Sequence, residues 1–187
     1  MALTLVMKFG GTSVGSAEAM DRAVHIVREE ATKWERLVVV ASAMSGVTDA
    51  LIQGAQTAAE GDDQTYRQVV IGLRHKHVTA IETLLKPGEE QARLLATIEA
   101  YLTEFATLCH SVHVLGEVTP RAMDAITSLG ERMSVRILAA TLRQQGVQSE
   151  AVDATGVIVT DHTFQSAAPL PEQTRHQVHE RLSPLLQ

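Results

Sequence analysis

The chain has 187 residues, of which 45% are hydrophobic and 20% charged, so it can bury a core and its composition excludes a disordered protein. Its 16 Lys and Arg residues against 22 Asp and Glu residues give a net charge of −6, which argues against a general nucleic-acid-binding protein. Aromatic residues make up only 3%, so the core must be aliphatic. The single cysteine, Cys109, allows no internal disulfide and no thiolate metal cluster.

The first 43 residues are typical of a strand–helix–strand unit. Residues 3–9 form an apolar run that stops at a pair of glycines, which predicts a buried strand. Ser16 can cap a helix that begins at the next residue. Residues 37–41 are apolar without alternation and mostly β-branched, which favours a parallel strand covered on both faces. We therefore expect two parallel strands with a right-handed helical crossover between them.

The middle of the chain is predicted to be helical. Thr48 or Asp49 can cap a helix that begins after the second strand and ends near Gly61. Two apolar stripes spaced by threes and fours then predict an antiparallel helical pair, laid on the sheet or on each other. The stripes comprise Val69, Val70, Leu73, His77, Ile81, Leu84 and Leu85, and then Ala92, Leu95, Ile98, Leu102, Phe105, Cys109 and Val112.

The last third of the chain is predicted to combine helices with short strands. Thr119-Pro120 is typical of a helix start, and Leu129-Gly130 is a candidate interruption of that helix. Residues 148–153 and 157–160 are predicted as two short strands, and a last amphipathic helix follows Pro171. The expected fold class is therefore α/β, with a helical middle section.

The first candidate functional segment runs from Lys8 to Gly15, where the first strand ends and a helix begins. Its glycines let backbone N–H groups approach an anion, and the helix N-terminus favours negative charge there. Lys8 adds a positive charge, and Thr12 and Ser13 add hydroxyl donors. The segment is not a Walker A loop, because Ser16 stands where that loop has its lysine. The alternative interpretation is a glycine turn beside an exposed lysine.

Two further segments are candidates for ligand contacts. Ser42, Ser45 and Thr48 offer hydroxyl groups after the second strand, and the carboxyl ends of neighbouring parallel strands line one cleft in open α/β sheets. The alternative is a routine strand-to-helix turn. Glu131, which follows Gly130, either complements the dipole at a helix start or accepts hydrogen bonds from a substrate ammonium group.

Four segments in this order resemble the motifs of aspartate kinase, in the amino acid kinase family. They are Lys8–Val14, Ser42–Asp49, Ser128–Ser134 and Val159–Phe164. The resemblance implies a three-layer αβα fold with a mainly parallel central sheet, incomplete at its C-terminal end. It also implies that residues 1–187 are the N-terminal, amino-acid-substrate lobe of the catalytic domain. The family's later Gly-Arg-Gly-Gly-Ser-Asp motif, most of its ATP site and its ACT regulatory domains are expected to lie outside this chain.

The activity implied by the resemblance is transfer of the γ-phosphoryl group of MgATP to the β-carboxylate of L-aspartate, the entry step to lysine, threonine and methionine synthesis. Lys8 would be the catalytic residue that neutralises the transferring phosphoryl group, and Mg²⁺ would arrive with ATP rather than on a protein metal site. The residues implied at the phosphates are Lys8, Gly10, Gly11, Thr12, Ser13 and Ser42. Those implied at the aspartate are Ser45, Thr48, Glu131 and Phe164, with Glu131 at its ammonium group.

The setting and partners follow from the same observations. The N-terminal residues lack a secretory signal, and no apolar run approaches the ~18 residues of a membrane span, so we expect a cytoplasmic protein that contacts no membrane. An incomplete sheet exposes an edge, which predicts a homo-oligomer. We expect this chain by itself to be weakly active or inactive. The alternatives are a non-catalytic aspartate-binding or assembly module, and another amino acid kinase.

Overall fold

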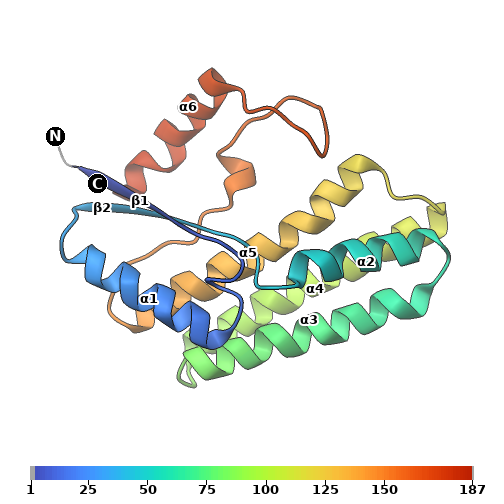
Figure 1. Cartoon of the computed structure of the whole chain (residues 1–187), viewed down its shortest axis with the longest axis horizontal. Helices are drawn as coiled ribbons and strands as arrows, with labels where there is room; N and C mark the ends of the chain where they lie inside the picture. The colour runs from blue at the N-terminus through green and yellow to red at the C-terminus, as the bar shows by residue number, and fades with distance from the viewer. Residues whose placement is uncertain (1–2, 187) are drawn as a thin grey trace.

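The computed structural model describes residues 3–186 and consists of two parallel strands and a larger set of helices (Figure 1). Met1, Ala2 and Gln187 lie outside the described residues. The elements in chain order are β1 (Thr4–Phe9), α1 (Ala17–Ala31), β2 (Arg36–Ala41), α2 (Val47–Ala59), α3 (Asp63–Leu84), α4 (Glu89–Leu115), α5 (Pro120–Gln144), the 3-10 turn η1 (Ala154–Gly156), α6 (Pro171–Arg181) and the 3-10 turn η2 (Ser183–Leu186).

The predicted strand–helix–strand unit is confirmed. β1 and β2 pair in parallel, with Thr4 opposite Arg36 and Phe9 opposite Ala41. Ser16 caps α1, because its side-chain oxygen accepts a hydrogen bond from the backbone N–H of Ala19 at 3.2 Å. Between residues 3 and 186 the sheet consists of these two strands.

One face of this sheet is open, which corrects the expectation that the second strand is covered on both faces. Along β1, exposed and partly buried residues alternate, so only every second side chain packs inward. Val6 of β1 is 63% exposed and Val40 of β2 is 47% exposed. The helices therefore supply a core for one side of the sheet, while apolar side chains remain on the other.

The predicted helical pair is also confirmed. α3 and α4 pack along each other and are joined by a short turn at residues 85–88. α5 begins at the expected position, with Thr119 as its cap and Pro120 at the first helical position. Gly130 does not interrupt α5, which runs unbroken to Gln144.

The start of α2 differs from its prediction. Neither Thr48 nor Asp49 caps this helix, because Gly46 precedes it in a left-handed conformation with φ of 73° and the helix has no side-chain cap. Thr48 and Asp49 instead lie in the first helical turn. A glycine that turns the chain sharply into the helix therefore replaces the expected hydroxyl or carboxylate cap.

The two short strands predicted over residues 148–153 and 157–160 do not form. The chain is irregular there, apart from η1 and one antiparallel bridge between Thr160 and Pro169. A strand requires a partner along its length, and this segment is bonded to a helix instead. The Ser149 hydroxyl donates to the Ala139 carbonyl at 2.9 Å, and Arg143 donates to the Ser149 carbonyl at 2.8 Å.

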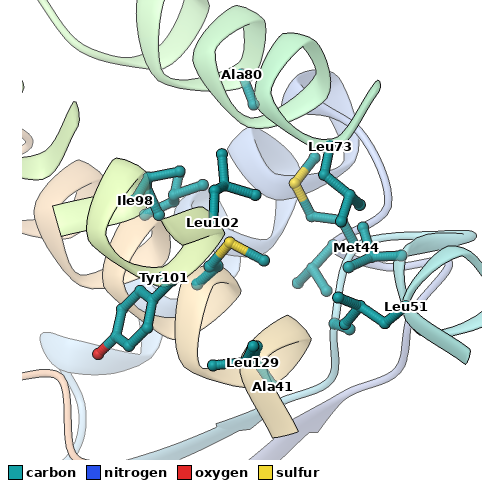
Figure 2. Packing of buried hydrophobic residues seen from close by; sticks show 14 of the residues in the cluster. Ala41, Met44, Leu51, Leu73, Ala80, Ile98, Tyr101, Leu102 and Leu129 are labelled. Carbon is teal, nitrogen blue, oxygen red and sulfur yellow. The ribbon is translucent and has the colours of Figure 1, made fainter. Parts of the chain in front are cut away.

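The core is aliphatic, as the composition predicted, and it links the helices to the loop that follows β2. Figure 2 shows Met44 of that loop in the same buried cluster as Leu51 of α2, Leu73 of α3 and Leu102 of α4. Met44 is only 2% exposed. The loop is therefore fastened to the helical part of the molecule by burial of its own side chain.

No helix between residues 3 and 186 combines the length and the apolar character that crossing a membrane requires.

His77 is a fully buried titratable residue in α3. Its Nδ1 lies 2.7 Å from the carbonyl oxygen of Leu73, and its Nε2 has no hydrogen-bond partner. Removal from water lowers the pKa of His77, the nearby positive charge of Lys76 lowers it further, and the hydrogen bond to Leu73 opposes both. The folded chain therefore holds the neutral imidazole.

We predict that the free energy of unfolding falls as the pH drops below about 6.5, because the unfolded chain then binds a proton that folded His77 resists. Urea unfolding of the wild type and of His77→Gln at pH 7.5 and pH 5.5 measures this. The difference in the free energy of unfolding between the two pH values should shrink in His77→Gln. It should stay unchanged in His75→Gln, an exposed position on the same helix. Equal pH dependence in all three proteins would contradict the role of His77.

Candidate ligand site at the ends of the two strands

Two loops lie side by side where β1 and β2 end. We call residues 10–15 the glycine loop and residues 42–46 the serine loop. The backbone N–H of Ser42 donates to the carbonyl of Phe9 at 3.0 Å, which continues the pairing of the strands into the loops. Within the glycine loop, the N–H of Ser13 donates to the carbonyl of Gly10 at 2.9 Å and forms a turn.

The two loops approach too closely for a side chain at Gly15. A Cβ atom there would lie 2.7 Å from the carbonyl oxygen of Gly11 and 2.8 Å from the Cβ of Ser45. Gly15 and Ser45 each stand two residues before a helix, so the N-termini of α1 and α2 are brought together. Each helix N-terminus carries a partial positive charge, and Lys8 at the end of β1 adds a full one. This end of the sheet is therefore suited to an anion.

The third predicted segment reaches the same place from α5. A Cβ atom on Gly130 would lie 2.8 Å from the Cβ of Ala43 and 3.2 Å from Cγ1 of Val47. Glu131 is the next residue, and its Oε1 accepts a hydrogen bond from the backbone N–H of Ala43 at 3.4 Å. The serine loop thus lies between the glycine loop and the middle of α5.

The position of Glu131 argues against one of its two interpretations. It lies in the middle of α5 rather than at a helix start, so it does not complement the N-terminal dipole of that helix. Its carboxylate is instead half-buried at the serine loop, and burying a carboxylate there has a cost unless it finds donors. A ligand that carries both an ammonium group and an anionic group matches this combination of charges.

The predicted site residues differ in how accessible they are. Lys8, Thr12, Ser13 and Ser45 are exposed, and Gly10, Gly11, Ser42, Thr48 and Glu131 are partly buried. The structure therefore brings residues of the first three segments to one end of the sheet, where each is exposed or partly buried.

Phe164 lies on a separate loop, which is fastened to the N-terminal part of α5. Its ring is 40% exposed, and the guanidinium carbon of Arg121 lies 5.7 Å from the ring centroid. The backbone N–H of Gln165 donates to Oδ2 of Asp124 at 2.9 Å. Asp124 and Glu131 are seven residues apart on α5, which places them two turns apart on one face of the helix. Phe164 is therefore held beside that face.

Sequence reasoning missed an ionic cluster behind Glu131. Arg132 forms ion pairs with Asp153 at 2.8 Å and with Glu104 of α4 at 3.3 Å, and its guanidinium lies over the Tyr101 ring at 4.7 Å. Hydrogen bonds from Thr155 and the charge of Arg132 lower the pKa of Asp153, although partial burial opposes them. The partners are far apart in the sequence, so no local sequence pattern predicts the cluster. It connects α5 to α4 and to the segment that follows α5.

Two other features of the described residues lie outside this site. No group of three or more His, Cys, Asp or Glu side chains between residues 3 and 186 is placed to hold a metal ion. A groove between α3 and α4, lined by Val70, Ile71, Ala106 and their neighbours, contains none of the predicted site residues.

Comparison with known proteins identifies the class to which this fold and site belong. The amino acid kinase family model matches residues 4–186, and the chain belongs to that family. The chain is 33% identical over 156 residues to bifunctional aspartokinase/homoserine dehydrogenase 1, chloroplastic, of Arabidopsis thaliana, and 32% identical over 160 residues to an aspartokinase of Schizosaccharomyces pombe. Each match covers 82% of this chain, but 16% and 30% of the respective relative.

Solved structures give the same result. Escherichia coli aspartokinase III in complex with aspartate and ADP superposes with a TM-score of 0.83 at 28% identity, over 98% of this chain and 38% of that chain. The same enzyme in complex with lysine and aspartate also gives a TM-score of 0.83. The predicted resemblance to aspartokinases and the predicted α/β fold are therefore confirmed, and the chain spans less than two fifths of these relatives.

We predict that Gly15→Ala destabilises the chain by about 1–3 kcal/mol, because its methyl group would press on the Gly11 carbonyl and on Ser45. Gly72→Ala is the control: Gly72 lies within α3 with open space around it, so alanine should stabilise the chain by about 0.5–1 kcal/mol. Urea unfolding measures both. Unchanged stability of Gly15→Ala would contradict the close contact between the loops.

Proposed function

We propose that this chain is the amino-acid-substrate lobe, residues 1–187, of an aspartate kinase catalytic domain. The reaction is transfer of the γ-phosphoryl group of ATP to the β-carboxylate of L-aspartate. The observation that carries the proposal is the meeting of two helix N-termini and the Glu131 carboxylate around one loop. The proposal is also supported by Escherichia coli aspartokinase III, whose structure is a complex with aspartate and ADP.

The proposed roles follow from the charge each group supplies. Phosphoryl transfer depends chiefly on positioning and on stabilising negative charge, which Lys8 and the two helix N-termini provide. The backbone of Gly10 and Gly11 approaches the phosphates, and Mg²⁺ enters as part of MgATP. Thr12, Ser13 and Ser42 donate hydroxyl hydrogen bonds to the same groups.

The aspartate is proposed to lie against the serine loop and α5. Glu131 accepts from its ammonium group, Ser45 and Thr48 donate to its carboxylates, and Phe164 walls the site. A half-buried carboxylate is a strong acceptor for an ammonium donor, because the hydrogen bond is charge-assisted. In the cell, we propose that the reaction takes place in the cytoplasm as the entry step to lysine, threonine and methionine synthesis.

We predict that the purified chain binds L-aspartate and that Glu131→Gln weakens this binding about tenfold, the size expected for loss of one charge-assisted hydrogen bond. Succinate, which has both carboxylates but no ammonium group, should bind the wild type as weakly as aspartate binds the variant. Isothermal titration calorimetry measures these affinities. Glu82→Gln, at an exposed position on α3, is the matched control and should bind like the wild type.

The same titration separates the alternatives. Tighter binding of L-glutamate or N-acetyl-L-glutamate than of L-aspartate would favour another amino acid kinase. In a hydroxylamine assay with MgATP and aspartate, this chain should form little or no aspartyl hydroxamate. We propose that most of the ATP site belongs to the part of the longer relatives that this chain does not match. Strong hydroxamate formation would contradict that part of the proposal.

A second candidate function, a non-catalytic assembly module, is favoured by the open face of the sheet. Val6 and Val40 are exposed there, and a two-stranded sheet leaves strand edges free to pair. We predict concentration-dependent self-association in sedimentation velocity, which Val6→Lys should weaken. Ile71→Lys, at a 54% exposed position on α3, is the control. A monomer at every concentration tested would contradict the homo-oligomer.

A further inference from the structure

The loop that carries Phe164 is closed by its own hydrogen bonds. The backbone N–H of Asp161 donates to the Ala168 carbonyl at 3.0 Å, and Oδ1 of Asp161 accepts from the N–H groups of Thr163 at 3.0 Å and Ala168 at 3.2 Å. These donors, led by the N–H of Thr163, lower the pKa of Asp161. Residues 161–168, which we call the Phe164 loop, therefore form a defined unit that can be positioned as a whole.

The tip of the Phe164 loop has an unusual backbone. Gln165 has φ of 65°, a left-handed conformation that residues with a side chain adopt infrequently. The N–H of this residue donates to Oδ2 of Asp124 at 2.9 Å. The charged acceptor Asp124 thus stabilises a backbone conformation of Gln165 that is unfavourable on its own.

The acceptor belongs to the helix that carries Glu131. Arg121, Asp124, Ser128 and Glu131 follow each other at spacings of three and four, so they share one face of α5. Glu131 is two turns, about 10 Å, beyond Asp124 along the helix axis. Figure 1 shows the chain between η1 and α6 reaching toward the first turns of α5. A single rigid helix therefore connects the tip of the Phe164 loop to Glu131.

We propose that Asp124 is a positioning residue for the aspartate site: by holding the N–H of Gln165, it fixes Phe164 relative to Glu131. This inference rests on the proposed function, because Phe164 walls the site only if the ligand lies there. Asp124 itself does not touch the substrate. Asp124 contributes to the affinity only by holding Phe164 in place, so removing either side chain should cause the same loss of affinity.

The first measurement needs no ligand. Amide hydrogen exchange followed by NMR should show faster exchange of the Gln165 N–H in Asp124→Ala, by about tenfold, the size of one charge-assisted hydrogen bond. Asp124→Asn keeps an acceptor oxygen and should retain part of the protection. Asp63→Ala, an acidic residue at the start of α3, is the control and should leave Gln165 unchanged. Unchanged exchange in Asp124→Ala overturns the inference.

The second measurement is the affinity for L-aspartate by calorimetry, in a double-mutant cycle. Asp124→Ala and Phe164→Ala should each weaken binding several-fold, and the double variant should be no weaker than Phe164→Ala alone. Additive losses, or unchanged affinity in Asp124→Ala, overturn the positioning role. If the wild type binds no aspartate, that result contradicts both the proposed function and the affinity part of this inference. The exchange of Gln165 still decides whether Asp124 holds the loop.

Discussion

The serine loop is enclosed between two glycines that come from distant parts of the chain. Gly15 lies against Ser45 on one side, and Gly130 lies against Ala43 on the other, each at a distance that leaves no room for a methyl group. Because neither glycine has a side chain, three backbone segments can meet around one loop. The placement of the helix N-termini and of Glu131 depends on this close packing.

The packing also determines the charge of the site. α1 and α2 both begin at the loops, so the positive ends of two helices face the same region. Glu131 of α5 adds a negative charge beside the serine loop, where the N–H of Ala43 donates to its carboxylate. Positive charge therefore lies at the glycine loop and the Glu131 carboxylate lies on α5. In the proposed site, we expect a ligand with charges of both signs to bind in the orientation that matches them.

Local signals in the sequence predicted two of the helix starts, although Gly46 replaces the side-chain cap expected for α2. The cap at Ser16 and the Thr119-Pro120 helix start were both predicted, because these residues act on their immediate neighbours. Gly130 was misread as a helix interruption because a glycine that breaks a helix and one that admits a neighbouring loop look alike in one sequence. The strands expected over 148–160 failed for a related reason, since a strand depends on a partner that its own residues do not specify. The hydrogen bond from Gln165 to Asp124 joins residues 41 positions apart, so no local sequence pattern predicts it.

The parts of the site differ in how firmly they are held. The serine loop is anchored by burial, since Ala43, Met44 and Val47 are almost fully removed from water. The Phe164 loop lies on the surface and is held by polar contacts such as those of Asp124 and Asp161. Surface segments with few buried apolar contacts open at a lower free-energy cost than segments of the core. In the proposed site, the serine loop is thus held by the core, whereas the Phe164 loop is the part that binding can order. Under that proposal, we expect a change in the polar contacts of the Phe164 loop to alter ligand affinity while the fold is retained.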